Sequence, residues 1–129
     1  MLIAGSGLLD KDESIGPNHP FADLAEGLST RGIVVLRYDK RTHLHPNIVT
    51  INPARFTVEQ ESLEDGIAAV ALLCRMPDVD ANRIFVIGHS EGAMLAPEIA
   101  ERAAPVTTTR LYDRRKRRPE NSPTFRVKH

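Results

Sequence analysis

Cysteine, aromatic side chains and long apolar runs are all scarce in this sequence of 129 residues. It has one cysteine and no tryptophan, and aromatic residues make up 5% of the chain. The lone cysteine, Cys74, cannot close an intrachain disulfide, and its place after the apolar run 67–73 predicts a packed, unreactive thiol. No apolar run approaches the roughly 20 residues that a membrane-spanning helix needs. These scarcities exclude a disulfide scaffold and predict no membrane partner.

A secretory leader is not expected at the start of the sequence. The first residues include no basic segment that leads into a long apolar stretch and a small-residue cleavage site. Together with the unpaired cysteine, this predicts a cytoplasmic protein. A composition of 41% hydrophobic and 26% charged residues indicates a folded globular chain. The length suits one domain but is short for a doubly wound enzyme.

The formal net charge of +0 conceals two segments of opposite charge. Residues 1–105 carry a net charge of −6, and residues 106–129 carry +6. This change in net charge after residue 105 predicts a folded domain over 1–105 and a basic, disordered tail over 106–129. The cluster of basic residues at 114–118 leaves open nucleic-acid binding or a nuclear import signal, but a solvated tail is the favoured interpretation. No preference for an oligomeric state follows.

Strands and helices are predicted to alternate along the chain. Strands are expected at 1–4, 33–36 and 83–87, and helices at 21–32, 57–74 and 93–104, with a loop at 42–55. Thr57 and Gln60 have the spacing of a helix capping box. Short β-branched runs such as 33–36 are typical of parallel strands buried on both faces. This order predicts an α/β fold with a central parallel sheet in a three-layer sandwich. After residue 105 no apolar run of four follows, so the chain is expected to leave the sheet.

The segment Gly88-His89-Ser90-Glu91-Gly92 lies between the third predicted strand and the helix after it. A G-x-S-x-G pattern in this place predicts a nucleophile elbow, a tight turn that exposes a serine hydroxyl above the strand ends. Ser90 is therefore the candidate catalytic nucleophile. The backbone N–H of Glu91 would lie at the positive end of a helix, where it can hold an oxyanion.

The loop Gly5-Ser6-Gly7 follows the first predicted strand, where a second oxyanion donor is expected. A plain tight turn and a phosphate-binding loop are alternatives. Asp10 stands where the third glycine of a dinucleotide-binding G-x-G-x-x-G would be, so this motif is absent. No cofactor is predicted.

Three segments together resemble a known family. They are residues 4–13 (AGSGLLDKDE), residues 37–41 (RYDKR) and residues 88–92 (GHSEG). This combination is similar to bacterial α/β-hydrolases of the carboxylesterase, dienelactone hydrolase and serine aminopeptidase-like group, and the resemblance extends over residues 1 to about 105. The chain has Ala4 where the family commonly has histidine, and Thr42 where it often has glycine.

The resemblance implies a serine hydrolase that acts on small-molecule esters or related acyl compounds. It assigns the oxyanion donors to the backbone N–H groups of Ser6 and Glu91. Gly5 and Gly7 are expected to line the substrate pocket. His89 is expected to line it as well, because neighbouring side chains project in different directions and His89 is a poor base for the Ser90 hydroxyl. The resemblance also implies that the strand at 33–36 and the strand at 83–87 lie on either side of the first strand.

In this family the triad acid and histidine follow the serine on later loops. Asp113, Glu120 and His129 are the only downstream candidates in the tail, and nothing in the sequence places them near Ser90. The fold is therefore expected to be a partial α/β-hydrolase domain, truncated at both ends. An inactive hydrolase remnant is the alternative.

Four further polar residues are weaker candidates. His43 and His45 are close enough in sequence to suggest a metal-binding pair, but no third ligand is evident. They are therefore interpreted as solvated loop residues, and no metal site is predicted. A catalytic role is open for Asp39 and Arg41, but a structural ion pair at a strand end is the favoured interpretation.

Overall fold

The computed structural model describes residues 1–48, 57, 60–103 and 107–110, the last four by their backbone. The elements in chain order are β1 (Leu2–Ile3), α1 (Pro20–Ser29), α2 (Arg41–Leu44), the π-helical turn η1 (Gln60–Glu64), α4 (Asp65–Leu73), the 3₁₀ turn η2 (Ala81–Arg83), β2 (Phe85–Gly88), α5 (Glu91–Arg102) and β3 (Thr107–Arg110). The predicted α/β class is confirmed in these ranges.

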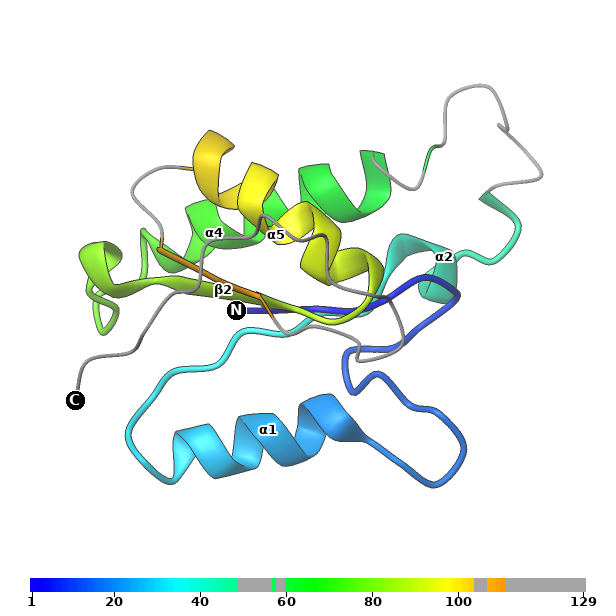
Figure 1. Cartoon of the computed structure of the whole chain (residues 1–129), viewed down its shortest axis with the longest axis horizontal. Coiled ribbons are helices and arrows are strands. Elements are labelled where there is room, and N and C mark those ends of the chain that lie inside the picture. Colours follow the sequence, from blue (N-terminus) through cyan, green and yellow to red (C-terminus); the bar gives the residue numbers. More distant parts are fainter. Residues whose placement is uncertain (49–56, 58–59, 104–106, 111–129) are drawn as a thin grey trace, which may run out of the picture.

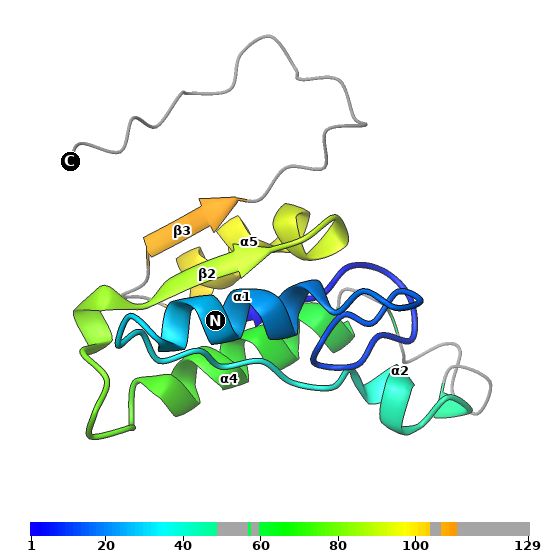
Figure 2. The same ribbon diagram turned by 90° about the horizontal axis from the view of Figure 1, so that it is seen from below.

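The three strands form one parallel sheet in the order β1-β2-β3. Leu2 pairs with Ile87 in β2, and Phe85 at the other end of β2 pairs with Thr107. Figure 2 shows β3 alongside β2. The prediction that the chain leaves the sheet after residue 105 is therefore wrong for Thr107–Arg110. That prediction required an apolar run, but threonine is β-branched and suits a strand without being apolar.

The segment 33–36 was predicted to be a buried strand, and this is wrong in part. It runs beside β1, where the Leu2 N–H donates to the Leu36 carbonyl at 2.9 Å, but it has no strand pairing of its own. The carbonyls of Met1 and Ile3 face the opposite side, where they accept hydrogen bonds from the N–H groups of Ile87 and His89. Side chains early in the segment are also half exposed, with Ile33 at 48% and Val34 at 51%, because no described element covers that side.

Helices lie on both faces of the sheet. In Figure 1, α1 lies on one side of β1 and β2, and α4 and α5 lie on the other. Successive residues of the first strand alternate between the two cores, as the pleat requires. Met1 and Ile3 pack with Val86 and Ile99 beneath α4 and α5, whereas Leu2 packs with Phe21 beneath α1. The predicted three-layer arrangement is thus present in the described part of the chain.

The helix predicted at 57–74 begins with the expected capping box. The Thr57 hydroxyl accepts the Gln60 N–H at 3.1 Å, and the Gln60 side chain accepts the Thr57 N–H at 3.3 Å. The first turn is π-helical, and the regular helix α4 starts only at Asp65. Cys74 caps α4 and packs, half buried, against the core, as predicted.

The predicted loop at 42–55 contains a short helix at its start, α2, which the sequence did not suggest. Residues 49–56 lie outside the described part of the chain. No helix in the described ranges has the length and apolar character that crossing a bilayer requires.

Tyr38 carries a buried hydroxyl that meets no hydrogen-bond partner among the described residues. Burial, with smaller contributions from the carboxylates of Asp65 and Glu61, raises the pKa of this phenol well above its usual range. The unfolded chain therefore ionises at Tyr38 from about pH 10, before the folded chain does. Below pH 10 the ionisation of Tyr38 therefore does not affect the free energy of unfolding, and above pH 10 that free energy falls because ionisation favours the unfolded chain.

We expect Tyr38→Phe to raise the free energy of unfolding by about 1 kcal/mol at pH 7, because it removes an unpaired buried polar group. The gain over the parent should widen above pH 10, since phenylalanine cannot ionise. Urea denaturation of both proteins at pH 7 and above pH 10 measures this. A lower stability of the variant at pH 7 would show that the hydroxyl has a partner.

Candidate functional site

Ser90 lies at the junction of β2 and α5 in a backbone conformation that L-residues rarely adopt. Its φ is 50° and its ψ is −113°. Such conformations cost about 1–3 kcal/mol, and they persist where the surrounding structure enforces them. Here the enforcing contacts come from the flanking glycines. A Cβ on Gly88 would lie 2.1 Å from the Gly92 carbonyl oxygen, and a Cβ on Gly92 would lie 2.3 Å from the Ile3 carbonyl oxygen.

The loop after β1 lies directly beside this turn. A Cβ built on Gly5 would be 3.3 Å from the Ser90 Cβ. The two segments that the sequence predicted to form one site are therefore adjacent, although 84 positions separate Ser6 from Ser90 in the chain. Gly5 is buried and Ser6 is exposed.

Two backbone N–H groups near Ser90 are available to a ligand. Within the described ranges, neither the Ser6 N–H nor the Glu91 N–H donates to a protein acceptor. Glu91 is the first residue of α5, so its N–H has no partner inside the helix and lies at the positive end of the helix dipole. This arrangement can stabilise negative charge on a bound oxygen atom.

Glu13 is a buried carboxylate that the sequence prediction did not include in the site. It is 1% exposed, and its Oε1 accepts the Gly5 N–H at 2.7 Å. The same oxygen lies 2.9 Å from Nδ1 of His89. His89 was predicted to line the pocket, and the structure shows that its ring is held by Glu13. One carboxylate thus ties the loop after β1 to the residue before Ser90.

The turn that carries Glu13 is stabilised by hydrogen bonds to Asp10. Asp10 accepts the N–H groups of Asp12 and Ser14 at 3.1 and 2.9 Å, and the Ser14 hydroxyl at 2.7 Å. The Ser14 bonds hold the pKa of the Asp10 carboxyl below its usual range. Glu13 has a φ of 54°, and this strained conformation turns its side chain into the protein beneath Gly5.

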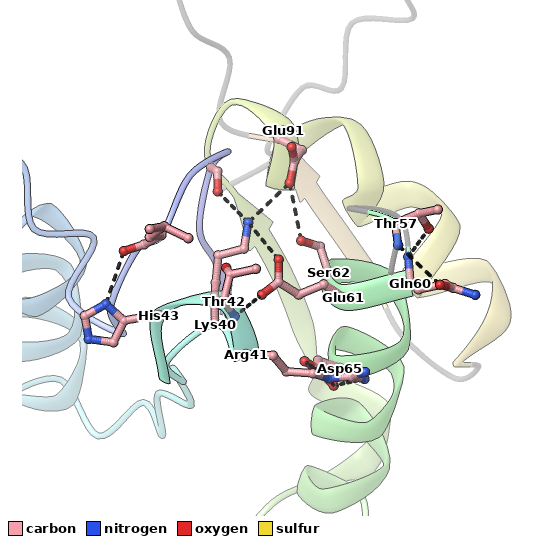
Figure 3. A network of polar contacts seen from close by, with 12 residues as sticks. Lys40, Arg41, Thr42, His43, Thr57, Gln60, Glu61, Ser62, Asp65 and Glu91 are labelled. Atoms are coloured by element: carbon pink, nitrogen blue, oxygen red, sulfur yellow. Dashed lines mark hydrogen bonds and ion pairs between the residues drawn. The ribbon is translucent and has the colours of Figure 1, made fainter. Parts of the chain in front are cut away.

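Lys40 is the second buried charge at the site, and it was not predicted either. It is 4% exposed, and its Nζ donates to the Gly5 carbonyl at 3.1 Å. Nζ also lies 3.4 Å from Oε1 of Glu91 and 3.7 Å from Oε2 of Glu61. Figure 3 shows these oxygens converging on the ammonium group, with the Ser62 hydroxyl donating to Glu91 at 3.3 Å.

Asp39 and Arg41 do not pair with each other, so that prediction is wrong. Arg41 forms a two-pronged contact with Asp65 at 2.9 and 2.5 Å, which raises the pKa of the guanidinium. Asp39 instead accepts the Lys11 N–H at 2.8 Å. Both residues are structural in this arrangement: Arg41 joins α2 to α4, and Asp39 holds the loop after β1.

The two histidines of the loop region do not lie together at a metal-binding cluster. Nδ1 of His43 contacts the Leu8 carbonyl at 3.1 Å, and His45 caps α2. In the described part of the chain, no group of three potential ligands could hold a metal ion. Asp113, Glu120, His129 and the basic cluster at 114–118 lie outside the described residues.

Two hollows of the described surface lie away from Ser90. They have volumes of about 440 and 660 Å³ and flank residues 33–35, and Ser90 lines neither. Gly7, which was predicted to line the substrate pocket, has a φ of 109°, and a Cβ built on it would lie 4.0 Å from Cγ of Leu9. The pocket residues Gly5, Gly7 and His89 therefore remain predictions.

The chain is similar to a curated esterase. It is 52% identical over 103 residues to esterase EstD of Thermotoga maritima, and the matched region covers 80% of this chain and 24% of that protein. The chain thus spans about a quarter of the length of the relative it matches. No family model matches the chain, and no solved structure matches it.

Proposed function

We propose that this chain supplies the nucleophile and the oxyanion hole of a serine hydrolase that acts on carboxylic esters, with the α/β-hydrolase fold. The observation that carries the proposal is the strained Ser90 at a strand-to-helix turn, adjacent to two backbone N–H groups that have no acceptor among the described residues. The similarity to an esterase at 52% identity supports the same substrate class.

The chemistry follows from these groups. The Ser90 hydroxyl attacks the ester carbonyl carbon, a C–O bond forms, and the carbonyl oxygen becomes an oxyanion. The N–H groups of Ser6 and Glu91 donate to this oxyanion, and their effect is largest in the transition state because the charge develops there. Collapse of the intermediate expels the alcohol and leaves an acyl group on Ser90, which water then removes.

Proton transfer from Ser90 needs a base. In the described ranges no imidazole is hydrogen-bonded to the Ser90 hydroxyl, and His89 is engaged by Glu13. Neighbouring side chains along a chain also project in different directions. The proposal therefore places the base outside the described residues, and it predicts that an added base can take its place.

We expect a fluorophosphonate probe to label Ser90 of the 129-residue chain, and added imidazole to speed the labelling by supplying the base. The phosphonyl group bonds to Oγ, fluoride leaves, and the imidazole takes the proton. Ser90→Ala should abolish the labelling. Mass spectrometry of the peptide that contains residue 90 measures the modified fraction over time.

Ser29→Ala is the matched control, because Ser29 is an exposed serine at the end of α1. Among the described residues its hydroxyl bonds only to the Glu26 carbonyl of its own helix. This variant should be labelled like the parent. Equal labelling of the parent and Ser90→Ala, or labelling spread over several exposed serines, would contradict the proposal.

A further inference from the structure

The peptide group between Gly5 and Ser6 has a buried cation on its carbonyl. Nζ of Lys40 donates to the Gly5 oxygen at 3.1 Å, and the lysine side chain is 5% exposed. The other end of the same planar group is the Ser6 N–H, which has no acceptor in the described part of the chain. Lys40 therefore contacts, from the far side, the peptide that carries one of the two available donors.

The geometry of a trans peptide links these two ends. The C=O and N–H bonds of the group are antiparallel and lie in one plane. A contact that fixes the direction of the Gly5 carbonyl consequently fixes the direction of the Ser6 N–H. The preceding peptide is held as well, because the Gly5 N–H donates to Glu13 at 2.7 Å. Both planes around Gly5 are thus fixed by buried charged side chains.

The ammonium also changes the strength of the donor. A cation on a carbonyl oxygen draws electron density through the amide, which makes the N–H of that amide a stronger donor, and hydrogen-bonded groups polarise one another in this way inside a protein. Charge-assisted bonds are roughly twice as strong as neutral ones.

Lys40 reaches the second donor residue too. Its Nζ lies 3.4 Å from Oε1 of Glu91, whose own N–H begins α5 beside Ser90. Glu61 completes the arrangement from η1, with Oε2 at 3.7 Å from Nζ and Oε1 accepting the Thr42 N–H at 2.6 Å. One ammonium group therefore connects the loop after β1, the start of α5 and η1 (Figure 3).

We propose that Lys40 is a positioning residue that orients and polarises the Gly5–Ser6 peptide, so that the Ser6 N–H is presented as an oxyanion donor at Ser90. The inference rests on the proposed function. In this arrangement Lys40 touches neither substrate nor Ser90, and it acts only through the peptide and through Glu91.

The test compares two variants that differ only at Lys40. Lys40→Met alone would leave Glu61 without its cation and risks misfolding, so Glu61→Gln serves as the reference and Lys40→Met/Glu61→Gln as the test variant. The glutamine keeps an oxygen for the Thr42 N–H. We expect the imidazole-assisted labelling of Ser90 to be about tenfold slower in the double variant, a smaller loss than the 10²–10³-fold of removing a donor outright, since the N–H remains but is misoriented.

A spectroscopic signature accompanies the rate. Loss of the ammonium from the Gly5 carbonyl should move the ¹³C resonance of that carbonyl and the ¹⁵N resonance of Ser6 upfield, while the resonances of Gly27 in α1 stay unchanged. A merely structural lysine would leave the labelling rate of Ser90 unchanged once the double variant is folded, even where these resonances move.

The outcomes separate the two proposals. Equal labelling rates in the two variants, or unmoved Gly5 and Ser6 resonances, would overturn the role of Lys40 while leaving Ser90 as the nucleophile. Absence of labelling at Ser90 in Glu61→Gln and in the parent would overturn the proposed function itself. Slower labelling together with the two upfield shifts supports the role of Lys40.

Discussion

Gly92→Ala is expected to unfold the chain at 25 °C. The new methyl carbon would lie 2.3 Å from the Ile3 carbonyl oxygen and 2.7 Å from that of Ala4. Both atoms belong to the backbone of β1 or the residue after it, so no side-chain rotation can relieve the contact. The start of α5 would have to move away from the sheet, and the loss should reach about 4 kcal/mol or more, at the extreme of single substitutions. A small domain has little more than this to lose.

Gly27→Ala is the matched control for this prediction. Gly27 lies inside α1, and the nearest atom to a new Cβ there would be a flexible Arg31 nitrogen at 3.9 Å. Alanine should stabilise that helix by up to about 1 kcal/mol. Circular dichroism with urea titration of both variants decides the matter, and a folded Gly92→Ala protein with parent-like stability would refute the close approach.

Local sequence patterns were sufficient to predict the turn at Ser90. Glycine is required at positions 88 and 92, because a Cβ at either position would lie 2.1–2.3 Å from a backbone oxygen atom. This requirement is expressed within five consecutive residues, between an apolar strand and a helix. The capping box of Thr57 and Gln60 was predictable for the same reason, since its two hydrogen bonds join neighbours in sequence.

The buried charges around Gly5 could not be predicted in this way. The chain positions of Lys40 and Gly5 differ by 35, and those of Lys40 and Glu91 by 51. Such partners meet only after the loop, η1 and α5 have packed together. In the sequence, Gly5 belongs to the segment 4–13 and Lys40 to the segment 37–41, but this did not predict that the two residues are in contact. Charged side chains are normally expected at the surface, so burial had to be observed.

Two strand predictions failed because an apolar composition does not determine whether a segment pairs with a neighbouring strand. Residues 33–36 have the composition of an interior strand, yet a single backbone hydrogen bond, from Leu2 to Leu36, is recorded between them and β1. Thr107–Arg110 lacks that composition, yet its backbone pairs with the whole of β2. Hydrophobic runs predict which segments can be buried, whereas hydrogen-bond pairing depends on which neighbour the tertiary structure supplies.

Lys40→Met is expected to lower the free energy of unfolding by about 3 kcal/mol at pH 7. Glu61 is 2% exposed, and without the ammonium its carboxylate would keep the Thr42 N–H but lose its cation. Removing one partner of a buried ion pair leaves an uncompensated charge, which is the costly case. Glu91 would suffer less, because its side chain is 20% exposed and lies at the positive end of α5.

The double variant Lys40→Met/Glu61→Gln should recover most of that loss. It removes both charges together, and neutral replacements of buried ion pairs are often close to neutral in stability. Urea denaturation of the parent, both single variants and the double variant gives the coupling energy between the two residues. A coupling near zero would mean that the Lys40 ammonium does not compensate the Glu61 carboxylate. A large coupling, with a folded double variant that labels slowly at Ser90, would separate the contribution of Lys40 to stability from its action on the Ser6 N–H.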